Sequence, residues 1–167
     1  MTESVTRMLA DDVASRALGI EVRDVSLGAA TATMTIRADM VNGHGITHGA
    51  FVFAVADTAF ACACNSHGPP TVAAAVDITF VAASRAGDVL EARAVERTRF
   101  GRSGIYDVTV RRGDDVIAEF RGTSRSIGQN PGVQDSEVKS SGVQNSGVKN
   151  SEVKNSEVKD SSAEGPA

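Results

Sequence analysis

The stretch Asn42–His67 reads N-G-H-G-I-T-H-G-A-F-V-F-A-V-A-D-T-A-F-A-C-A-C-N-S-H. From Gly49 to Cys64 its only charged residue is Asp57, and apart from the cysteines its only other polar residue is Thr58. Sixteen residues rich in Ala, without Pro or a second Gly, are too long for one strand and favour a helix. Apolar residues on all its sides predict that this helix is buried.

A membrane-spanning helix is the alternative interpretation of such a stretch. Crossing the hydrocarbon takes about 20 mainly apolar residues. Here a carboxylate stands in the middle, most other residues are small alanines, and Gly68-Pro69 closes the segment. We therefore expect a buried helix of a globular domain and no contact with a membrane.

Asp57 is the first candidate for a functional residue. Burial of an unpaired carboxylate costs several kcal/mol and usually raises its pKa. A structural role stays open, because Asp57 can accept hydrogen bonds from the backbone or Thr58, or pair with an Arg from a strand.

The composition divides the chain of 167 residues into two parts. Residues 1–127 are expected to form one domain, whereas residues 128–167 form a low-complexity tail that repeats V-K-N-S-E and related pentapeptides. With one apolar residue in five, the tail cannot bury enough surface to fold, and we expect disorder.

The charge balance argues against nucleic acid as a partner. Of the 17 Lys and Arg and the 21 Asp and Glu, the tail holds four and six, which leaves 13 and 15 for the domain. A domain without excess positive charge lacks the electrostatic footprint of a nucleic-acid-binding protein.

The two cysteines, Cys62 and Cys64, point about 200° apart on a helix and cannot bridge within the chain. They are expected to be small core residues in a reducing compartment. The first residues, M-T-E-S-V-T-R-M-L-A-D-D, carry acids where a signal peptide has a basic stretch. We expect a cytoplasmic location.

The rest of the domain alternates between helical and strand patterns. Residues 4–18 carry a helical apolar stripe, and residues 39–47 form a loop that leads to the buried helix. Runs rich in Val, Thr, Ile and Ala predict strands at residues 20–27, 30–37, 71–83, 88–100, 103–112 and 116–127. This order predicts an α+β fold with a mainly antiparallel six-stranded sheet that curls around the helix, and such a helix favours a dimer.

Several groups with functional potential meet at the start of the buried helix, namely Asn42, His48 and the backbone N–H groups of Gly49 and Ala50. The first N–H groups of a helix have no partner within it and suit a carbonyl oxygen that gains negative charge. Asp57 lies nine residues beyond His48, or about 13 Å along the axis. If both act on one substrate, the helix start must come from one subunit and Asp57 from its two-fold partner.

The segment N-G-H-G-I-T-H-G-A-F-V-F-A-V-A-D-T-A-F-A resembles the helix-start motif of hotdog-fold acyl-CoA thioesterases, specifically the phenylacetic-acid-degradation (PaaI-type) family. Further matches are A-C-N-S-H-G, A-G-D-V-L-E-A, S-G-I-Y-D-V-T-V and F-R-G-T-S-R-S-I-G, in that order. The resemblance covers residues 8–128.

This resemblance implies a hotdog fold, with a long central helix wrapped by the sheet, and dimers that pair into homotetramers. It implies an enzyme of phenylacetate degradation, a thioester hydrolase that cleaves aryl-acyl-CoA substrates such as phenylacetyl-CoA or hydroxyphenylacetyl-CoA without a metal or other cofactor. By the same resemblance Asp57 is the nucleophile or the general base, Asn42 positions water or the acyl group, His48 sits beside the thioester, and the Gly49 N–H polarises its carbonyl. Ala50, Thr58 and Arg85 are expected to contact the substrate.

The sequence departs from the family pattern at several positions. Gly-Gly after the histidine is replaced by Gly49-Ala50, and the usual Arg-Pro-Gly turn by Ala82-Ala83-Ser84-Arg85. A hydroxyl that relatives carry on the strand after the helix is missing from Val72–Val76, with Thr71 or Thr79 as substitutes. The remaining candidates are Arg85, Arg99 and Arg102 for the CoA phosphates, Phe51, Phe53 and Phe60 for an acyl pocket or plain core, His44 for loop support, and His67 for the helix end.

Two other functions stay open on this scaffold. A hotdog hydratase or dehydratase has an acid followed by a downstream histidine, but the only histidine after Asp57 is His67. A non-catalytic acyl-CoA-binding module predicts binding without release of CoA.

Overall fold

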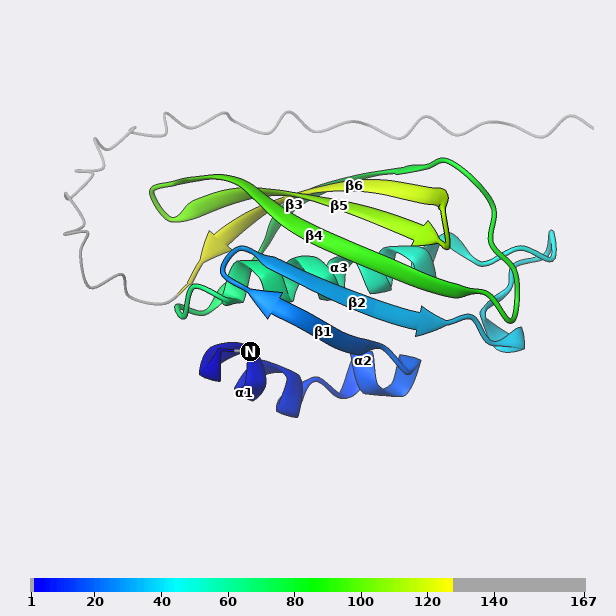
Figure 1. Cartoon of the computed structure of the whole chain (residues 1–167), viewed down its shortest axis with the longest axis horizontal. Coiled ribbons are helices and arrows are strands. Elements are labelled where there is room, and N and C mark those ends of the chain that lie inside the picture. The colour runs from blue at the N-terminus through cyan, green and yellow to red at the C-terminus, as the bar shows by residue number, and fades with distance from the viewer. Residues whose placement is uncertain (1, 128–167) are drawn as a thin grey trace, which may run out of the picture. The chain divides into compact units, whose positions relative to one another are not determined.

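The long apolar helix lies at the centre of the molecule (Figure 1). The computed structural model describes residues 2–127, so the expected tail at residues 128–167 lies outside the described residues. Helix α3 runs over Gly49–Asn65, and ten of its 17 residues are buried. The prediction of a buried helix that ends before Gly68 is confirmed.

Six strands form one antiparallel sheet that curves over α3 within the described residues (Figure 1). The sheet order is β1-β2-β4-β5-β6-β3, and every neighbouring pair is antiparallel. The strands are β1 (Glu21–Ser26), β2 (Ala29–Thr35), β3 (Thr71–Phe80), β4 (Val89–Phe100), β5 (Ser103–Arg112) and β6 (Asp115–Ser126). The predicted α+β hotdog fold is confirmed.

Small residues allow the sheet to approach α3 closely. On β4, Leu90, Ala92 and Ala94 are buried while the residues between them are more exposed, as expected for a strand with one face on the core. On β6, a Cβ atom at Gly122 would lie 2.8 Å from Cζ of Phe60. The glycine therefore makes room for a buried ring of the helix.

Strand β3 is an exposed edge of the sheet. Eight of its ten residues are exposed, including Val72, Val76 and Phe80. An apolar edge strand with unpaired N–H and C=O groups is a template for pairing with another chain. The edge strand β1 differs, because its exposed positions are polar, namely Glu21, Arg23, Asp24 and Ser26.

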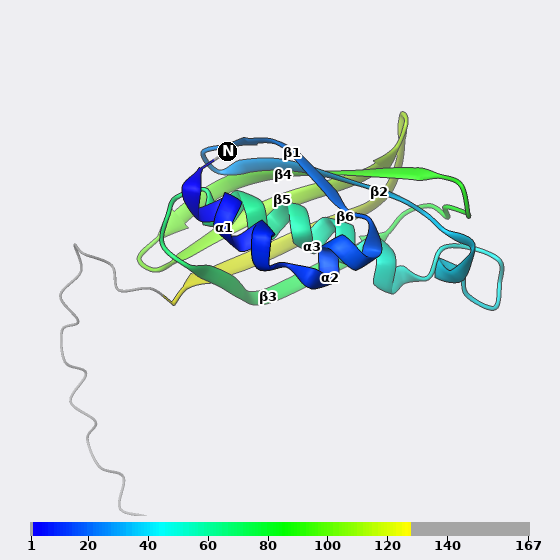
Figure 2. The same cartoon turned by 90° about the horizontal axis from the view of Figure 1, so that it is seen from below.

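The N-terminal segment is two helices where the sequence predicts one. Helix α1 covers Glu3–Asp11 and α2 covers Val13–Leu18, with a break at Asp12. Asp12 leaves the helical conformation and its carboxylate accepts hydrogen bonds from the N–H and hydroxyl of Ser15, at 2.9 and 2.6 Å. An aspartate that caps a helix in this way competes with the helix interior. Both helices lie across α3 on the side away from the sheet (Figure 2).

The sequence predicts that the strand after α3 ends at residue 83, whereas strand β3 ends at Phe80. The N–H groups of Val81 and Ala82 both donate to the carbonyl of Ile117, at 2.8 and 3.2 Å, so the regular ladder stops there. The loop before α3 also contains a short 3₁₀ helix, η1, at Ala38–Met40.

Both cysteines are free thiols in the core. Burial raises the pKa of each thiol to about 12, and the charge of Asp12 adds to the effect on Cys62. The predicted role as small core residues is confirmed. None of the helices within residues 2–127 combines the length and hydropathy needed to cross a bilayer.

Candidate active site

The loop that enters α3 is fastened to the segment after β3. The N–H of Thr47 donates to the carbonyl of Ser84 at 2.8 Å, and the Ser84 hydroxyl donates to the Thr47 hydroxyl at 2.7 Å. Both side chains are buried. An isolated bridge between Val41 and Thr47 closes the loop on itself. The helix start is therefore held in a defined position relative to the sheet.

His48 caps the start of α3 with its ring. Its Nδ1 accepts a hydrogen bond from the N–H of Ala50 at 3.1 Å. Since Nδ1 is the acceptor, the neutral ring carries its proton on Nε2. The exposed ring can thus donate from Nε2 to a ligand at the helix start.

This cap corrects one expectation, namely that the N–H groups of Gly49 and Ala50 are both free. The N–H of Ala50 is occupied by His48, whereas the hydrogen bonds among residues 2–127 leave the Gly49 N–H without an acceptor. The amide of Gly49 is therefore the donor that α3 offers to a ligand.

Asn42 presents its amide N–H₂ group. Its Oδ1 accepts a hydrogen bond from the N–H of His44 at 2.9 Å, which is an Asx turn. Because this bond occupies the oxygen, the Nδ2 group remains as a donor. His44 is exposed and takes part in this turn through its backbone, in keeping with its expected support of the loop.

Asp57 is half-buried in the middle of α3. Its carboxylate has no hydrogen bond or ion pair with any residue from 2 to 127, so the structural partners considered from the sequence are absent there. Burial raises the pKa of Asp57 above its ordinary value of 3.8, with no partner to offset the shift. A carboxylate with these properties is suited to accept a proton.

Asp57 lies on the same helix as Gly49, eight residues further along, which corresponds to about 12 Å along the axis. The chain by itself therefore does not bring the carboxylate and the Gly49 amide to one reacting atom. A site shared between two subunits therefore stays a prediction.

The three residues expected to contact substrate occupy different environments. Ala50 is exposed at the helix start, next to His48. Thr58 is buried, and its hydroxyl bonds the carbonyl of Ala54 at 2.9 Å and the hydroxyl of Ser15 at 3.1 Å. Arg85 is exposed and donates to the carbonyl of Gly45, at 3.3 Å, in the entry loop. Ala50 and Arg85 are thus near the helix start, whereas Thr58 faces α2.

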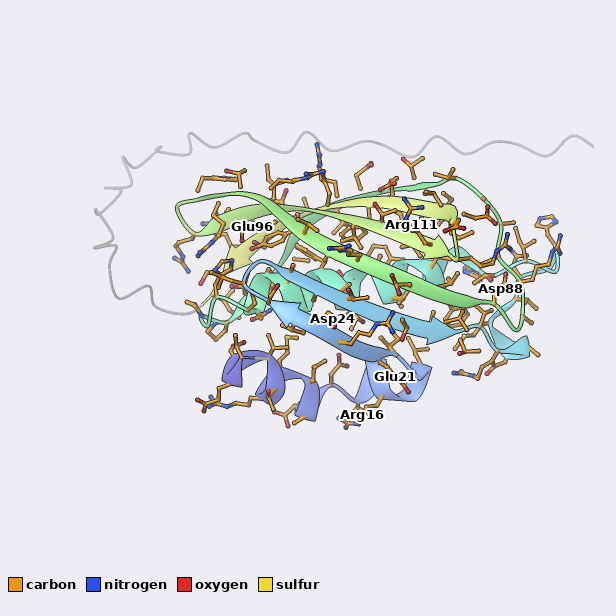
Figure 3. All side chains as sticks on the ribbon, in the orientation of Figure 1. Arg16, Glu21, Asp24, Asp88, Glu96 and Arg111 are labelled. Carbon is orange, nitrogen blue, oxygen red and sulfur yellow. The ribbon has the colours of Figure 1, made fainter. Side chains whose placement is uncertain are left out.

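Asp88 keeps the Arg85 segment in place. Its carboxylate accepts the N–H of Arg85 at 2.8 Å and a side-chain N–H of Arg112 at 3.1 Å, and these bonds lower the pKa of Asp88. Figure 3 shows Asp88 at the end of the sheet where α3 begins and Glu96 at the opposite end.

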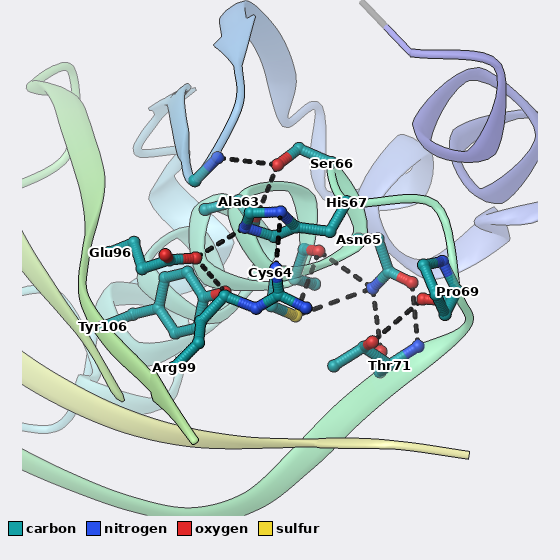
Figure 4. A network of polar contacts seen from close by, with 12 residues as sticks. Ala63, Cys64, Asn65, Ser66, His67, Pro69, Thr71, Glu96, Arg99 and Tyr106 are labelled. Atoms are coloured by element: carbon teal, nitrogen blue, oxygen red, sulfur yellow. Dashed lines mark hydrogen bonds and ion pairs between the residues drawn. The ribbon is translucent and has the colours of Figure 1, made fainter. Parts of the chain in front are cut away.

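A separate polar network closes the far end of α3 (Figure 4). The Glu96 carboxylate accepts the Tyr106 hydroxyl at 2.8 Å and lies 2.5 Å from Nε2 of His67, while Nδ1 of His67 lies 3.0 Å from Nη1 of Arg99. Arg102 donates to the carbonyl of Ser126 at 2.9 Å. Of the three arginines considered for CoA phosphates, only Arg85 therefore lies near the helix start. The sequence did not indicate this network, because no motif links Glu96 to His67.

The hydroxyls proposed to replace the missing one are engaged or distant. Thr71 donates to the carbonyl of Pro69 at 2.9 Å. Thr79 shares a hollow with Asp77, Arg97 and Asp107, on the sheet face away from α3.

The phenylalanines of α3 pack mainly into the core. Phe60 is buried against Tyr106 and Phe120, and half-buried Phe53 also contacts Phe120. Phe51 lies edge-on to the His48 ring, with centroids 6.3 Å apart. In residues 2–127, no three His, Cys, Asp or Glu side chains gather as a metal-binding group.

Comparison with known proteins agrees with this fold. Residues 44–119 match the profile of the Thioesterase superfamily. The acyl-coenzyme A thioesterase PaaI of Escherichia coli is 43% identical over 122 residues, which cover 72% of this chain and 87% of the relative.

Solved structures show the same likeness. A structure of E. coli PaaI, a protein from the phenylacetic acid degradation operon, has a TM-score of 0.73 and 41% identity, over 75% of this chain and 92% of that one. A mutant of the phenylacetic acid degradation protein PaaI from Thermus thermophilus has a TM-score of 0.66 and 37% identity, over 68% and 97% of the two chains. The chain belongs to the hotdog-fold thioesterases and, among them, to the PaaI-type acyl-CoA thioesterases.

Proposed function

We propose that this enzyme hydrolyses aryl-acyl-CoA thioesters of the phenylacetyl-CoA type, with Asp57 as the base that activates water. The observation that carries the proposal is the half-buried carboxylate of Asp57, which has no hydrogen-bond or ion-pair partner among residues 2–127 and whose pKa is raised by burial. The aryl substrate is supported by the likeness to E. coli PaaI, which comes from the phenylacetic acid degradation operon.

The functional unit is a homodimer that pairs through β3. Support comes from the exposed apolar edge of this strand, where Val72 and Val76 are 46% and 41% exposed. A two-fold axis beside β3 places the α3 helices antiparallel, so the start of one approaches the middle of the other. Each of two equivalent sites then combines Gly49 of one subunit with Asp57 of its partner.

Two further features of this proposal rest on the family and the composition. Dimers pair into a homotetramer, as the PaaI resemblance implies. The cytoplasm is the proposed location, because the two buried thiols are those of a protein in a reducing compartment.

The residues at the helix start hold the thioester. Its carbonyl oxygen accepts the N–H of Gly49, which the positive end of α3 strengthens as a donor. Nε2–H of His48 and the Nδ2 group of Asn42 lie on the same loop and orient the thioester and the attacking water.

The carboxylate of Asp57 in the partner subunit then acts as the base for hydrolysis. Asp57 takes a proton from water as the water oxygen forms a bond to the carbonyl carbon, and the oxyanion is held by the Gly49 N–H. Collapse of this intermediate breaks the carbon–sulfur bond. The proton passes from Asp57 to the thiolate, which releases CoA–SH and the free aryl acid.

Mixing of two inactive variants tests the shared site. Asp57→Asn and Asn42→Ala remove groups that the proposal assigns to opposite subunits of each site. In a dimer that contains one of each, one site keeps both wild-type halves, so random mixing restores about a quarter of the wild-type activity. Recovery no greater than the average of the two separate variants contradicts a shared site. The subunits are mixed by joint unfolding and refolding, and Asp57→Asn alone, taken through the same procedure, is the control.

A further inference from the structure

Phe80 is an aromatic ring placed directly on the start of α3. A Cβ atom built at Gly49 would lie 2.9 Å from Cζ of Phe80 and 3.4 Å from both Cε atoms. The far edge of the ring therefore rests against the backbone of Gly49, whose N–H has no acceptor in the part of the chain that the structure describes. Only glycine at position 49 allows this approach without a shift of the ring.

Both ends of this contact are anchored. Phe80 pairs with Ala118 of β6 in the sheet, and the next N–H, of Val81, donates to the carbonyl of Ile117. On the other side, the pair of hydrogen bonds between Thr47 and Ser84 ties the entry loop of α3 to the segment after β3. The position of the ring relative to Gly49 is thus set by the fold.

Much of the ring is nevertheless free to contact a ligand. Phe80 is 52% exposed although it touches the helix start, and Phe100 at the end of β4 has a similar exposure of 54%. The other aromatic residues of the sheet, Tyr106 and Phe120, are buried. Phe80 is therefore the sheet residue that presents an open aromatic surface beside the Gly49 amide.

We propose that Phe80 determines acyl specificity by serving as the wall against which the aryl group of the substrate packs. This inference rests on the proposed function, because it takes the Gly49 N–H as the partner of the thioester carbonyl. When the thioester carbonyl accepts the Gly49 N–H, the acyl group attached to it begins within contact distance of the Phe80 ring. Two aromatic rings in an offset or edge-on arrangement attract each other more than their buried apolar area alone accounts for. A straight alkyl chain gains only the effect of its buried area.

The test is the ratio of kcat/KM for phenylacetyl-CoA to that for hexanoyl-CoA, measured for the wild type and Phe80→Leu. We expect Phe80→Leu to lower this ratio by about three- to tenfold. Phe100→Leu is the matched control, since it removes an equally exposed ring away from the helix start, and it leaves the ratio within about twofold of the wild type. A ratio in Phe80→Leu that equals that of Phe100→Leu overturns the proposal.

Phe80→Tyr and Gly49→Ala extend the test if Phe80→Leu folds poorly. Tyr keeps the ring, so the ratio is retained. The methyl group that Gly49→Ala adds would push the ring aside, so the ratio falls as in Phe80→Leu, and Gly49→Ala in the Phe80→Leu background lowers it no further. Equal ratios in the wild type and Gly49→Ala contradict the proposal.

A binding measurement separates this proposal from the proposed catalysis. Calorimetry with the non-hydrolysable thioether analogues of phenylacetyl-CoA and hexanoyl-CoA reports the same selectivity without turnover. If the wild type hydrolyses neither thioester, the proposed function fails, while a selectivity for the aryl thioether that Phe80→Leu removes still supports the role of Phe80. Equal affinity of the wild type for both thioethers overturns it.

Discussion

The hydroxyl of Ser84 donates a hydrogen bond of 2.7 Å to the hydroxyl of Thr47, and Ser84 is only 2% exposed. This bond joins the segment after β3 to the loop that carries Asn42 and His48. It occurs in the segment Ala82-Ala83-Ser84-Arg85, which stands where the resemblance implies an Arg-Pro-Gly turn. The side chain of Ser84 therefore helps to fix the position of the helix start through this hydrogen bond.

Ser84→Ala is therefore expected to weaken both the fold and the site. Loss of a buried hydrogen bond that leaves a hydroxyl unpaired costs about 1–3 kcal/mol in the free energy of unfolding. A looser entry loop lowers kcat/KM by about three- to tenfold, because the donors at the helix start are less well positioned. Urea denaturation and steady-state kinetics measure the two effects. Ser26→Ala, at an exposed serine of β1, should change neither, and a Ser84→Ala enzyme with wild-type stability would contradict the role given to this bond.

The pH dependence of kcat/KM should report Asp57. The base must be ionised, and burial raises the pKa of this carboxyl above 3.8. Activity is therefore expected to fall as the pH decreases through a value above 3.8, with a slope of one proton. Asp24→Asn, which removes one exposed carboxylate from β1, keeps the same profile. A rate that stays constant down to pH 3.8 in the folded enzyme would contradict proton transfer to Asp57.

Asp57→Asn should stabilise the protein near neutral pH. A carboxyl whose pKa is raised on folding binds its proton more tightly in the folded state, so its contribution to stability is full below 3.8 and is lost as the pH rises through the raised pKa. Asparagine carries no charge and avoids this loss. The melting temperature of Asp57→Asn is expected to exceed that of the wild type at pH 7, and the difference should shrink toward pH 3.8. A variant that is less stable than the wild type at pH 7 would show that Asp57 has a stabilising partner.

The network at the far end of α3 should act on stability and not on turnover. Tyr106 is 1% exposed and its hydroxyl bonds Glu96, so Glu96→Ala leaves a buried hydroxyl without this acceptor. We expect Glu96→Ala to cost more than Tyr106→Phe, which should cost about 1 kcal/mol, and the double variant to cost less than the sum. Burial, together with the bond to Glu96, also raises the pKa of Tyr106. Additive losses in the cycle would disprove the coupling.

The main elements of the fold could be predicted from the sequence because their signals are local. An apolar Ala-rich run with one acid predicts the buried helix, and alternating runs with turn residues predict the strands. The break at Asp12 was missed because its side chain competes with the helix through hydrogen bonds that an apolar stripe does not reveal. The early end of β3 depends on the carbonyl of Ile117, 36 residues further on, and no local pattern contains it.

The sequence marks the candidate residues of the site but not their hydrogen-bond partners. Asp57 stands out as a candidate because a carboxylate is unusual on an apolar helix. The bond from Ala50 to His48, and the bond from Thr58 to Ser15, depend on side-chain directions that spacing alone does not determine. The contact between Phe80 and Gly49 depends on how the sheet packs on α3, because the two residues are 31 positions apart in the sequence.

The most direct test of the account is the release of free thiol from a panel of acyl-CoAs by the wild type and by Asp57→Asn. The panel contains phenylacetyl-, hydroxyphenylacetyl- and benzoyl-CoA together with short and long straight chains. We predict release from the aryl substrates that falls by about 100- to 10,000-fold in Asp57→Asn, while the variant remains folded and still binds CoA. A folded wild type that binds CoA but releases no thiol from any substrate, or an Asp57→Asn variant with wild-type turnover, would contradict it.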